Sequence, residues 1–416
     1  MTPALIKWPT KRIRFVTKRG TSIEQGRLLS QAREATFLAM ESIGEQGEID
    51  LSVVRAVDEV SSGYTQFFDG DVVVAKITPC FENGKGALVN GLLGGVGFGT
   101  TELHVLTPGP ELDGRFLYFI TASPPFRRLG EASMTGAAGQ KRVTEDFVRD
   151  FRIPVPPLAQ QGAIADYLER ETARLDALVA AKERVLGLLA EKRRALITRA
   201  VTRGVDPRAP LRDSGIPWLG KIPAHWETER SRWLFRERDQ RSETGEEELL
   251  TVSHLTGVTL RSEKDVNMFE AETTEGYKIC LAGDLVINTL WAWMGAMGVS
   301  PVNGLVSPAY NVYQPGPRLE PSYVDALVRL PVFAQEVTRY SKGVWSSRLR
   351  LYPEGFFEVF LPVPPLTEQS AIVAHIAKET GKLDELRVAT ERTTVLLKER
   401  RAALISAAVT GQLQVA

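Results

Sequence analysis

Two stretches of the chain carry apolar residues at a regular helical spacing. Each stretch places a large aliphatic side chain at intervals of seven residues, with one interruption. Such a spacing predicts a long helix that packs along another helix. The positions are Leu168, Leu175, Leu189 and Leu196 in the first stretch, and Ile376, Leu383, Leu397 and Leu404 in the second.

Further residues refine this helix prediction. Leu178 and Val185 follow their neighbours in the pattern by three residues, and the repeat is interrupted at Lys182 and at Thr390. Gly204 and Gly411 are candidate C-terminal stops, because glycine adopts the left-handed conformation that ends many helices. The alternative is two separate helices, each packed on its own domain.

The two stretches belong to a duplication. PVPPLAQQGAIADYL from Pro154 aligns without a gap with PVPPLTEQSAIVAHI from Pro362, and the similarity continues to Thr202 and Thr410. Roughly half of the aligned residues are identical, which exceeds what two unrelated amphipathic helices share. The offset between the two copies is constant, and it is far too long for a stacked solenoid repeat. The pattern therefore predicts a duplicated module.

The remainder of each module has a mixed pattern. Short strand-like runs such as DVVVAKI at Asp71 and DLVINTL at Asp284 are separated by Gly and Pro turns. The predicted fold class is α+β: two mixed α/β domains joined by two long helices that form an antiparallel coiled coil, with internal pseudo-two-fold symmetry. The predicted bounds are a domain at 1–150, a helix at 151–205, a domain at 206–358 and a helix at 359–416.

This arrangement predicts two-site binding. The second helix, running back along the first, would relate the two modules as the subunits of a homodimer are related. About 40 helical residues extend roughly 60 Å, against ~34 Å for one turn of DNA. The helices would then act as a ruler between the two domains. Because the domains are less alike than the helices, they would read two unlike short sequences.

The charge balance limits how the chain can contact nucleic acid. Its 51 basic residues equal its 51 acidic residues, so any DNA contact is expected to be local. One basic cluster precedes the first acid, Glu24, and its alternative reading is a solvated terminal face. The cluster consists of Lys7, Lys11, Arg12, Arg14, Lys18 and Arg19.

Other features place the chain among cytoplasmic proteins. The N-terminal residues lack the apolar core of a signal peptide, and no uninterrupted apolar run long enough to cross a membrane follows. Cys80 and Cys280 are far apart in the sequence and give neither a disulfide framework nor a zinc motif. We expect a cytoplasmic location, no membrane contact, and reduced thiols.

Several motifs in order resemble the specificity subunits of type I restriction-modification systems. They are FFDGDVVVAKITPCFENGKGAL at Phe67, SGIPWLGKIPAHWE at Ser214, GDLVINTL at Gly283, SPAYNVYQP at Ser307, and the two PVPPL helices. Together they cover nearly the whole chain, although a single one would be weak. The N-terminus departs from the pattern, because it lacks the full PWLGKIPAHWE lead-in of the second module.

The resemblance implies a function and a set of partners. Each domain would be a target-recognition domain for double-stranded DNA, and two modification (methyltransferase) subunits would bind the scaffold. Restriction subunits, which are ATP-dependent nucleases, would join the complex. S-adenosylmethionine, ATP and Mg would be bound by these partner chains, with no cofactor on this chain.

Candidate DNA contacts in the first domain lie in two segments. Lys76, Thr78, Asn83 and Lys85 offer donors and acceptors on a strand and its following turn, and a polar hairpin without a ligand is the alternative. GAAGQKRV at Gly136 adds Lys141 and Arg142, because glycines allow close approach to phosphate. A solvated loop is the alternative for this segment.

The second domain has corresponding candidates. Asn288 and Thr289 lead into Trp291 and Trp293, which the pattern places on one face of a strand. These aromatic side chains could pack against sugar or base, although aromatic residues on strands usually belong to a core. SKGVWSSRLR at Ser341 contributes the last two candidates, Arg348 and Arg350, with a solvated loop as the alternative.

The sequence offers no catalytic or metal centre. No GxxxxGK[ST] or HExxH motif occurs, and the four histidines are scattered. We therefore predict a chain that is not an enzyme. One rival is a methyltransferase or nuclease fused to its own recognition domains, for which no segment is evident. The other is a free-standing two-site DNA-binding protein or a helical scaffold, which the duplication and the helices alone would permit.

Overall fold

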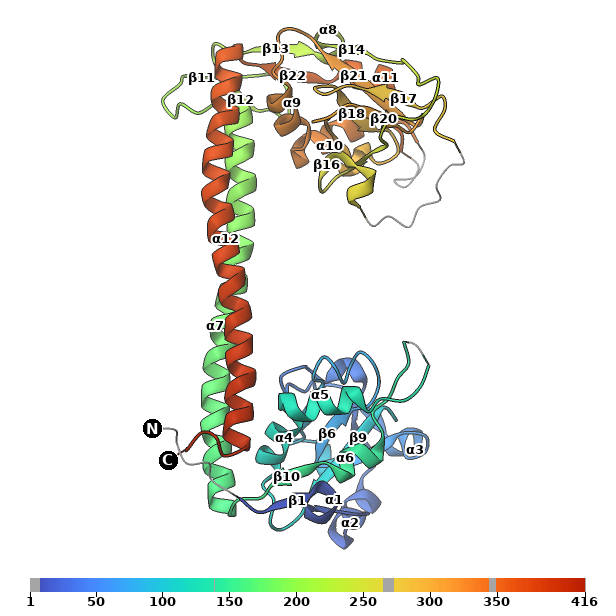
Figure 1. The fold of residues 1–416 in the computed structure, drawn as a ribbon, viewed down its shortest axis with the longest axis vertical. Helices are drawn as coiled ribbons and strands as arrows, with labels where there is room; N and C mark the ends of the chain where they lie inside the picture. The colour runs from blue at the N-terminus through green and yellow to red at the C-terminus, as the bar shows by residue number, and fades with distance from the viewer. Residues whose placement is uncertain (1–7, 138, 265–272, 344–348, 416) are drawn as a thin grey trace. The chain divides into compact units, whose positions relative to one another are not determined.

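The computed structural model describes residues 8–137, 139–264, 273–343 and 349–415 (Figure 1). The chain divides into two compact units, Met1–Glu183 with Glu391–Ala416, and Arg184–Thr390. Each unit contains one globular domain and one part of each of two long helices, α7 (Leu158–Arg203) and α12 (Leu366–Val409). The units are described in turn.

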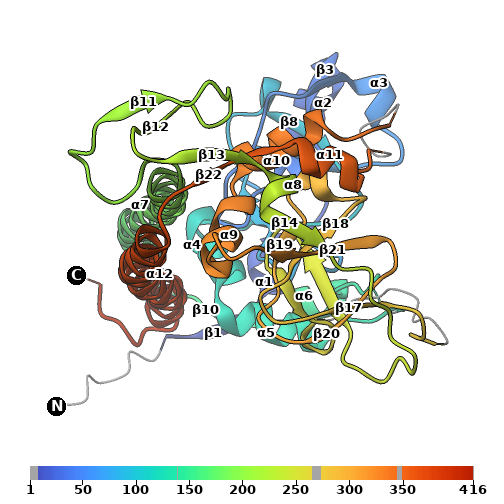
Figure 2. The same cartoon turned by 90° about the horizontal axis from the view of Figure 1, so that it is seen from above.

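The helices α7 and α12 pack antiparallel in each unit. In the first unit Asp176 pairs with Arg401 at 2.9 Å and Glu183 with Lys398 at 3.4 Å, so positions rise along α7 as they fall along α12. In the second unit the C-terminal end of α7 and the N-terminal end of α12 share one core, through Val201 and Ile372. Figures 1 and 2 show the two helices side by side.

The apolar repeat accounts for the seam between the helices. Leu168, Leu175 and Leu383 are buried, and the other repeat positions are half-buried. Leu178 and Val185 complete the seam less well than expected, since 44% and 40% of their surfaces stay exposed. Thr390 fits within its helix because its hydroxyl donates to the Leu386 carbonyl at 2.7 Å, a bond that threonine often makes in helices.

Sequence signals also explain where the long helices begin and end. Prolines directly precede both, as expected for a residue that lacks an N–H and has a fixed φ. Each helix is followed by a left-handed glycine, Gly204 with φ 73° and Gly411 with φ 75°. Both glycines were predicted as helix stops.

The first domain is built on two four-stranded sheets. One sheet has the strand order β2–β9–β6–β7 and the other β4–β3–β8–β5. A strand pair, β1 with β10, joins the start of the domain to the residues that enter α7. The strands are β1 (Thr10–Arg12), β2 (Thr17–Lys18), β3 (Glu34–Leu38), β4 (Val54–Ala56), β5 (Thr65–Phe68), β6 (Val72–Ala75), β7 (Gly86–Leu88), β8 (Val96–Gly99), β9 (Leu103–Pro108) and β10 (Arg152–Pro154).

Short helices surround these sheets. The helices are α1 (Ile13–Val16), α2 (Ile23–Gln31), α3 (Val57–Val60), α4 (Gly114–Ala122), α5 (Pro124–Ala132) and α6 (Glu145–Asp150), with 3-10 turns η1 (Met40–Ser42) and η2 (Leu93–Gly95). The main core lies between the β2–β9–β6–β7 sheet, α4 and the long helices. It contains Val72 and Val74 of β6 and Phe116 of α4.

The second domain repeats the first of these two sheets, and its other described strands form two-stranded pairs. Its four-stranded sheet has the order β14–β21–β18–β19, which corresponds strand for strand to β2–β9–β6–β7. The pair β13–β22 corresponds to β1–β10. The strands are β11 (Leu211–Asp213), β12 (Lys221–Pro223), β13 (Glu227–Arg230), β14 (Phe235–Glu237), β15 (Leu250–Ser253), β16 (Gly257–Leu260), β17 (Lys278–Cys280), β18 (Leu285–Asn288), β19 (Met297–Val299), β20 (Gly304–Val306), β21 (Tyr310–Pro315) and β22 (Phe360–Val363).

The helices of the second domain correspond to α1, α4, α5 and α6 of the first, and no described helix corresponds to α2 or α3. They are α8 (Ser231–Leu234), α9 (Pro321–Val328), α10 (Pro331–Arg339) and α11 (Pro353–Glu358), with 3-10 turns η3 (Arg261–Glu263) and η4 (Ala292–Met294). The lead-in hairpin β11–β12 brings Trp226 into the core, where its Nε1 donates to Glu368 of α12 at 2.9 Å. The predicted fold class of two mixed α/β domains with long antiparallel helices and an internal repeat is confirmed.

One buried glutamine fixes each domain to its long helix. Gln161 of α7 accepts from the Asp113 N–H and donates to the carbonyls of Glu111 and Pro156, at 2.7–2.9 Å. Gln369 of α12 makes the same three bonds, to Glu320, Arg318 and Pro364, at 2.8 Å. Satisfying all amide atoms makes such a buried residue specific for one geometry.

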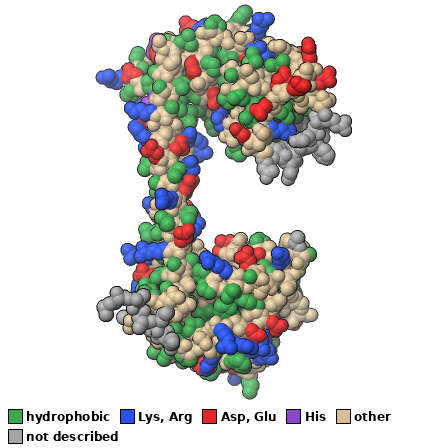
Figure 3. Space-filling view, viewed as in Figure 1, with side chains coloured by type: hydrophobic (Ala, Val, Ile, Leu, Met, Phe, Trp, Pro, Cys, Tyr) green, Lys and Arg blue, Asp and Glu red, His purple; other side chains and the backbone are tan. Residues whose placement is uncertain are grey.

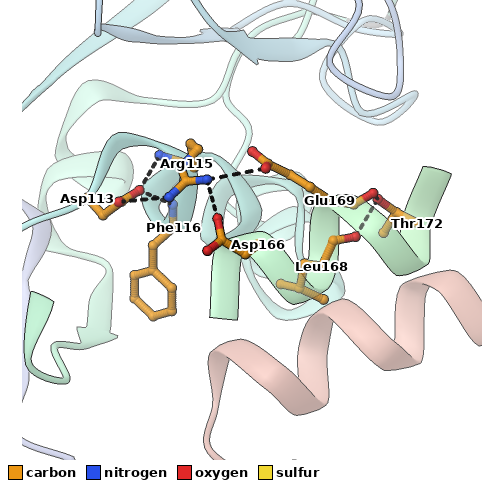
Figure 4. Close-up of polar contacts among 7 residues, drawn as sticks. All are labelled: Asp113, Arg115, Phe116, Asp166, Leu168, Glu169 and Thr172. Atoms are coloured by element: carbon orange, nitrogen blue, oxygen red, sulfur yellow. Dashed lines mark hydrogen bonds and ion pairs between the residues drawn. The ribbon is translucent and has the colours of Figure 1, made fainter. Parts of the chain in front are cut away.

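An ion-pair cluster around Arg115 adds to this junction in the first unit. Arg115, at the start of α4, reaches Asp166 at 2.5 Å and Glu169 at 3.3 Å on α7 (Figure 4). The same view shows the Thr172 hydroxyl donating to the Leu168 carbonyl within α7. The equivalent position on α9 is Ser322, whose side chain carries no positive charge. The glutamine is therefore the common device, and the arginine is particular to the first unit.

Candidate nucleic-acid interface

The two candidate segments of the first domain lie together at one end of β6. The backbone N–H of Thr78 donates to the Lys141 carbonyl and that of Val143 to the Lys76 carbonyl, each at 2.9 Å. We call residues 76–85 and 139–143 the first loop pair. Two segments that are far apart in the sequence are thus joined by backbone hydrogen bonds, as a composite recognition surface on loops requires.

Most predicted contact residues of the first loop pair are bound within the domain. Lys76 donates to the Thr101 carbonyl at 2.9 Å, and its burial lowers the pKa of its amine. Lys85 donates to the Met40 carbonyl at 2.8 Å, and the Thr78 hydroxyl to Glu82 at 2.9 Å. These three side chains hold the loop in shape.

Arg142 is committed to an acid. Its guanidinium grips the Glu102 carboxylate with Nε and Nη2, at 2.9 and 2.8 Å, and this hydrogen bonding raises the pKa of Arg142. Asn83 and Lys141 are exposed, and neither side chain has a hydrogen bond or ion pair with the described residues. Among the predicted contacts of this domain, Asn83 and Lys141 are the two that can meet a ligand without breaking an internal bond.

Arg127, which was not among the residues predicted from sequence, stabilises the first loop pair from the domain interior. Arg127 of α5 donates to the carbonyls of Phe81 at 3.1 Å and Gly84 at 2.9 Å, and its guanidinium lies 4.8 Å from the Phe81 ring centre. Burial lowers the pKa of Arg127 to about 10, so it stays charged at neutral pH. In the described part of the chain no carboxylate pairs with it.

His104 fixes the other segment of the same loop pair. This β9 residue is buried, and its Nε2 bonds the Val143 carbonyl at 3.0 Å. Burial lowers the pKa of the imidazole to about 4, so His104 is neutral at physiological pH and Nε2 is the donor. It has a structural role, as the scattered positions of the histidines indicated.

The N-terminal basic cluster is partly neutralised by acids of the same domain. Lys11 pairs with Glu111 and Arg14 with Asp150, each at 2.7 Å. Lys7 lies outside the described residues. The cluster therefore offers less free positive charge than its sequence suggests.

The second domain joins its two candidate segments through one matching backbone hydrogen bond. The N–H of Leu351 donates to the Thr289 carbonyl at 3.1 Å, which matches the bond from Val143 to Lys76. We call residues 289–296 and 349–351 the second loop pair. The Thr289 hydroxyl donates to the Ala309 carbonyl at 2.8 Å. Asn288 is buried at the base of this loop, and its Oδ1 has no partner among the described residues.

The strand predicted for the two tryptophans is wrong. Strand β18 ends at Asn288, and hydrogen bonds from Met294 to Trp291 and from Gly295 to Ala292 wind the next residues into the 3-10 turn η4. Gly295, with φ 87°, allows the chain to leave this turn. The rings of Trp291 and Trp293 therefore stack, with centres 6.3 Å apart and planes at 19°.

The tryptophan pair is available at the surface. Trp291 is 52% exposed, whereas Trp293 is half-buried and donates through Nε1 to the Leu290 carbonyl at 3.1 Å. Arg350 is exposed, and its backbone pairs with that of Lys342. Arg348 lies outside the described residues. The second loop pair thus offers an aromatic face and the Arg350 cation, where the first offers an amide and a cation.

Figure 3 shows Lys and Arg side chains mixed with Asp and Glu on the face that it draws. Among the described residues, no group of three His, Cys, Asp or Glu side chains is placed to hold a metal ion. No helix in the described ranges is long and apolar enough to cross a membrane.

A family model matches the segment of the chain that contains the first loop pair. The family model of the type I restriction modification DNA specificity domain matches residues 59–186. This chain is 44% identical over 177 residues to the specificity subunit of the type I restriction enzyme EcoEI from Escherichia coli. That alignment covers 39% of this chain and 30% of the relative, so the chain spans less than a third of the length of the curated relative it matches.

Solved structures share the fold over the whole chain. A chain from a type I R-M system, solved to describe complex assembly and conformational transition, is 20% identical with a TM-score of 0.68, covering 99% of this chain and 100% of that one. The HsdS subunit from Thermoanaerobacter tengcongensis is 19% identical with a TM-score of 0.57 and the same coverage. At this identity the similarity establishes the fold. The family model and the curated relatives confirm the resemblance predicted from the motifs over the part of the chain that they cover.

Proposed function

We propose that this chain is the DNA sequence-recognition subunit of a type I restriction-modification complex, which reads a bipartite, asymmetric target. Each loop pair would read one half of the target. The observation that carries the proposal is the position of the first loop pair inside the segment, residues 59–186, that matches a DNA specificity domain. The second loop pair keeps one of the two backbone hydrogen bonds, from Leu351 to Thr289, at the end of an equivalent strand.

The different chemistry of the two loop pairs supports an asymmetric target. Asn83 and Lys141 can bond base edges and phosphate, whereas Trp291 can pack against a sugar or a base. Domains that present such different groups would select different bases. The long helices would hold the two domains at a set spacing, leaving the bases between the half-sites unread.

Catalysis would belong to partner chains. The chain would dock two modification (methyltransferase) subunits, which would bind S-adenosylmethionine, and restriction subunits, which would use ATP and Mg. The chain itself would not be an enzyme. Its relatives in the comparisons are specificity subunits, which is consistent with this division of labour.

Co-purification with partner chains tests the proposal. The chain, expressed with methyltransferase subunits, should carry two of them and bind DNA tightly only in their company. A purified chain that methylates or cuts DNA by itself would contradict the proposal. Tight binding of the solitary chain to one palindrome would instead favour a free-standing DNA-binding protein, and a helical scaffold would bind no specific DNA.

A further inference from the structure

The first short helix of each domain exposes a large aromatic side chain at the same position. Phe15 in α1 is 69% exposed and Trp233 in α8 is 73% exposed. The two helices are equivalent, because the N–H at the start of each bonds a carbonyl at matching positions of the duplication, Phe151 and Val359. Single exposed apolar residues are common, but a matched pair in a duplicated chain is not explained by chance exposure.

The charged neighbours of these aromatic residues are also duplicated. Arg12 and Arg14 both pair with Asp150, at 3.2 and 2.7 Å. Arg230, at 2.9 Å, and Arg232 both pair with Glu358, the residue that the duplication aligns with Asp150. We call these groups the first and second aromatic sites: Arg12, Arg14, Phe15 and Asp150, and Arg230, Arg232, Trp233 and Glu358.

This retention contrasts with the divergence of the loop pairs. The second loop pair replaces the polar loop of the first with a tryptophan pair, as expected when two domains read different bases. The aromatic sites keep two arginines, one carboxylate and one exposed ring in both domains. A surface kept alike in two otherwise divergent domains fits a ligand that is the same for both.

The position of the aromatic sites argues against DNA as that ligand. In the first unit, Arg127 of α5 bonds the first loop pair, and Figure 1 shows α1 on the opposite side of the domain from α5. In the second unit, Gly295 of the second loop pair lies against α10, because a Cβ atom placed on Gly295 would be 3.6 Å from the Cβ of Ala334. Figure 1 shows α8 on the opposite side of this domain from α10. A duplex on the loop pairs would not reach the aromatic sites.

We infer that the two aromatic sites are equivalent docking points for two copies of one protein partner. This inference rests on the proposed function and names the partner as the methyltransferase subunit. Each site has one net positive charge beside an exposed ring, since a single carboxylate faces two arginines. The matching partner segment would place a carboxylate next to apolar side chains. Aromatic and arginine side chains are the groups that most often dominate binding at protein interfaces.

Native mass spectrometry of the full complex tests the inference. The wild-type chain should carry two methyltransferase subunits. Phe15→Ala and Trp233→Ala should each weaken one of the two binding events by about tenfold or more, and the double variant should weaken both. Phe15→Trp and Trp233→Phe should restore binding, because they keep an exposed ring.

Matched controls test whether binding weakens because a docking residue is lost or because any exposed apolar side chain is removed. Ile23→Ala and Leu255→Ala remove side chains that are 96% and 74% exposed, outside the aromatic sites, and should leave both binding events unchanged. Thermal unfolding should show that all variants fold.

The possible outcomes distinguish this inference from the proposed function. A double variant that binds both subunits as the wild type does would overturn the inference alone. Weaker DNA binding with intact subunit binding would assign the surface to DNA, and loss of self-association would assign it to a second copy of this chain; both also overturn it. A wild-type chain that binds no methyltransferase subunit would overturn the proposed function.

Discussion

A buried side chain beneath the first loop pair, Arg127, stabilises the conformation of the loop. Arg127 bonds carbonyls on either side of the turn that presents Asn83. A guanidinium that serves only backbone carbonyls cannot be replaced by an apolar side chain without leaving buried acceptors unpaired. The conformation of Asn83 therefore depends on a residue in a different element, far from it in the sequence.

Arg127→Met tests this dependence. We expect a loss of about 1–3 kcal/mol in the free energy of unfolding, because the loop carbonyls lose their donors. We also expect relaxed base preference at one half-site only. Urea unfolding and methylation specificity of the assembled complex would measure the two effects. Arg128→Met, at an exposed position of the same helix, is the control, and an unchanged base preference in Arg127→Met would refute the role.

His104 predicts a pH dependence of stability. Its folded pKa of about 4 lies below its ordinary value of 6.5, so the unfolded chain binds a proton between these values that the folded chain does not. Stability should therefore fall as pH drops from about 6.5 to 4, by at most about 3 kcal/mol from this residue. His104→Gln, which keeps a donor for the Val143 carbonyl, should flatten the urea-unfolding profile over that window. If the free energy of unfolding changed with pH equally in the variant and the wild type, His104 would not be the source of the pH dependence.

At the scale of elements, the long helices could be predicted from sequence and the sheets could not. The two helices, of 46 and 44 residues, repeat one pattern, so local spacing and duplication agree. The strands are mostly short, and their order depends on contacts between distant segments. The sequence located both loop pairs, but the internal bonds of Lys76 and Lys85 involve Thr101 and Met40, which no local pattern indicates.

The long helices also carry a prediction of their own. Inserting one heptad after Glu183 and one after Thr390 lengthens both partners of the antiparallel pair equally. Each helix lengthens by about 10 Å, which equals roughly three base pairs of DNA. The unread spacer of the target should grow by about that amount while both half-sites stay the same.

Insertion into only one helix is the control for this experiment. It shifts the register of pairs such as Asp176–Arg401 and should reduce stability instead of altering the spacer. An unchanged spacer in the double insertion would contradict a spacing role for the helices.

At the scale of the whole molecule, duplication followed by divergence explains the division of roles. The elements that join each domain to a long helix are nearly the same in both units, as the bonds of Gln161 and Gln369 show. The loop pairs share an arginine, Arg142 and Arg350, and otherwise differ in the side chains expected to contact DNA. Such a chain can change one half of its target without altering the other, because the altered residues lie far from the shared junctions.

Methylation mapping in a host that carries the full complex tests the central claim most directly. The wild-type chain should produce one bipartite motif with two unlike half-sites separated by unread bases. Exchange of residues 1–150 for the corresponding domain of a relative should change one half-site and leave the other intact. A palindromic or continuous motif, or a change in both half-sites after the exchange, would contradict the account.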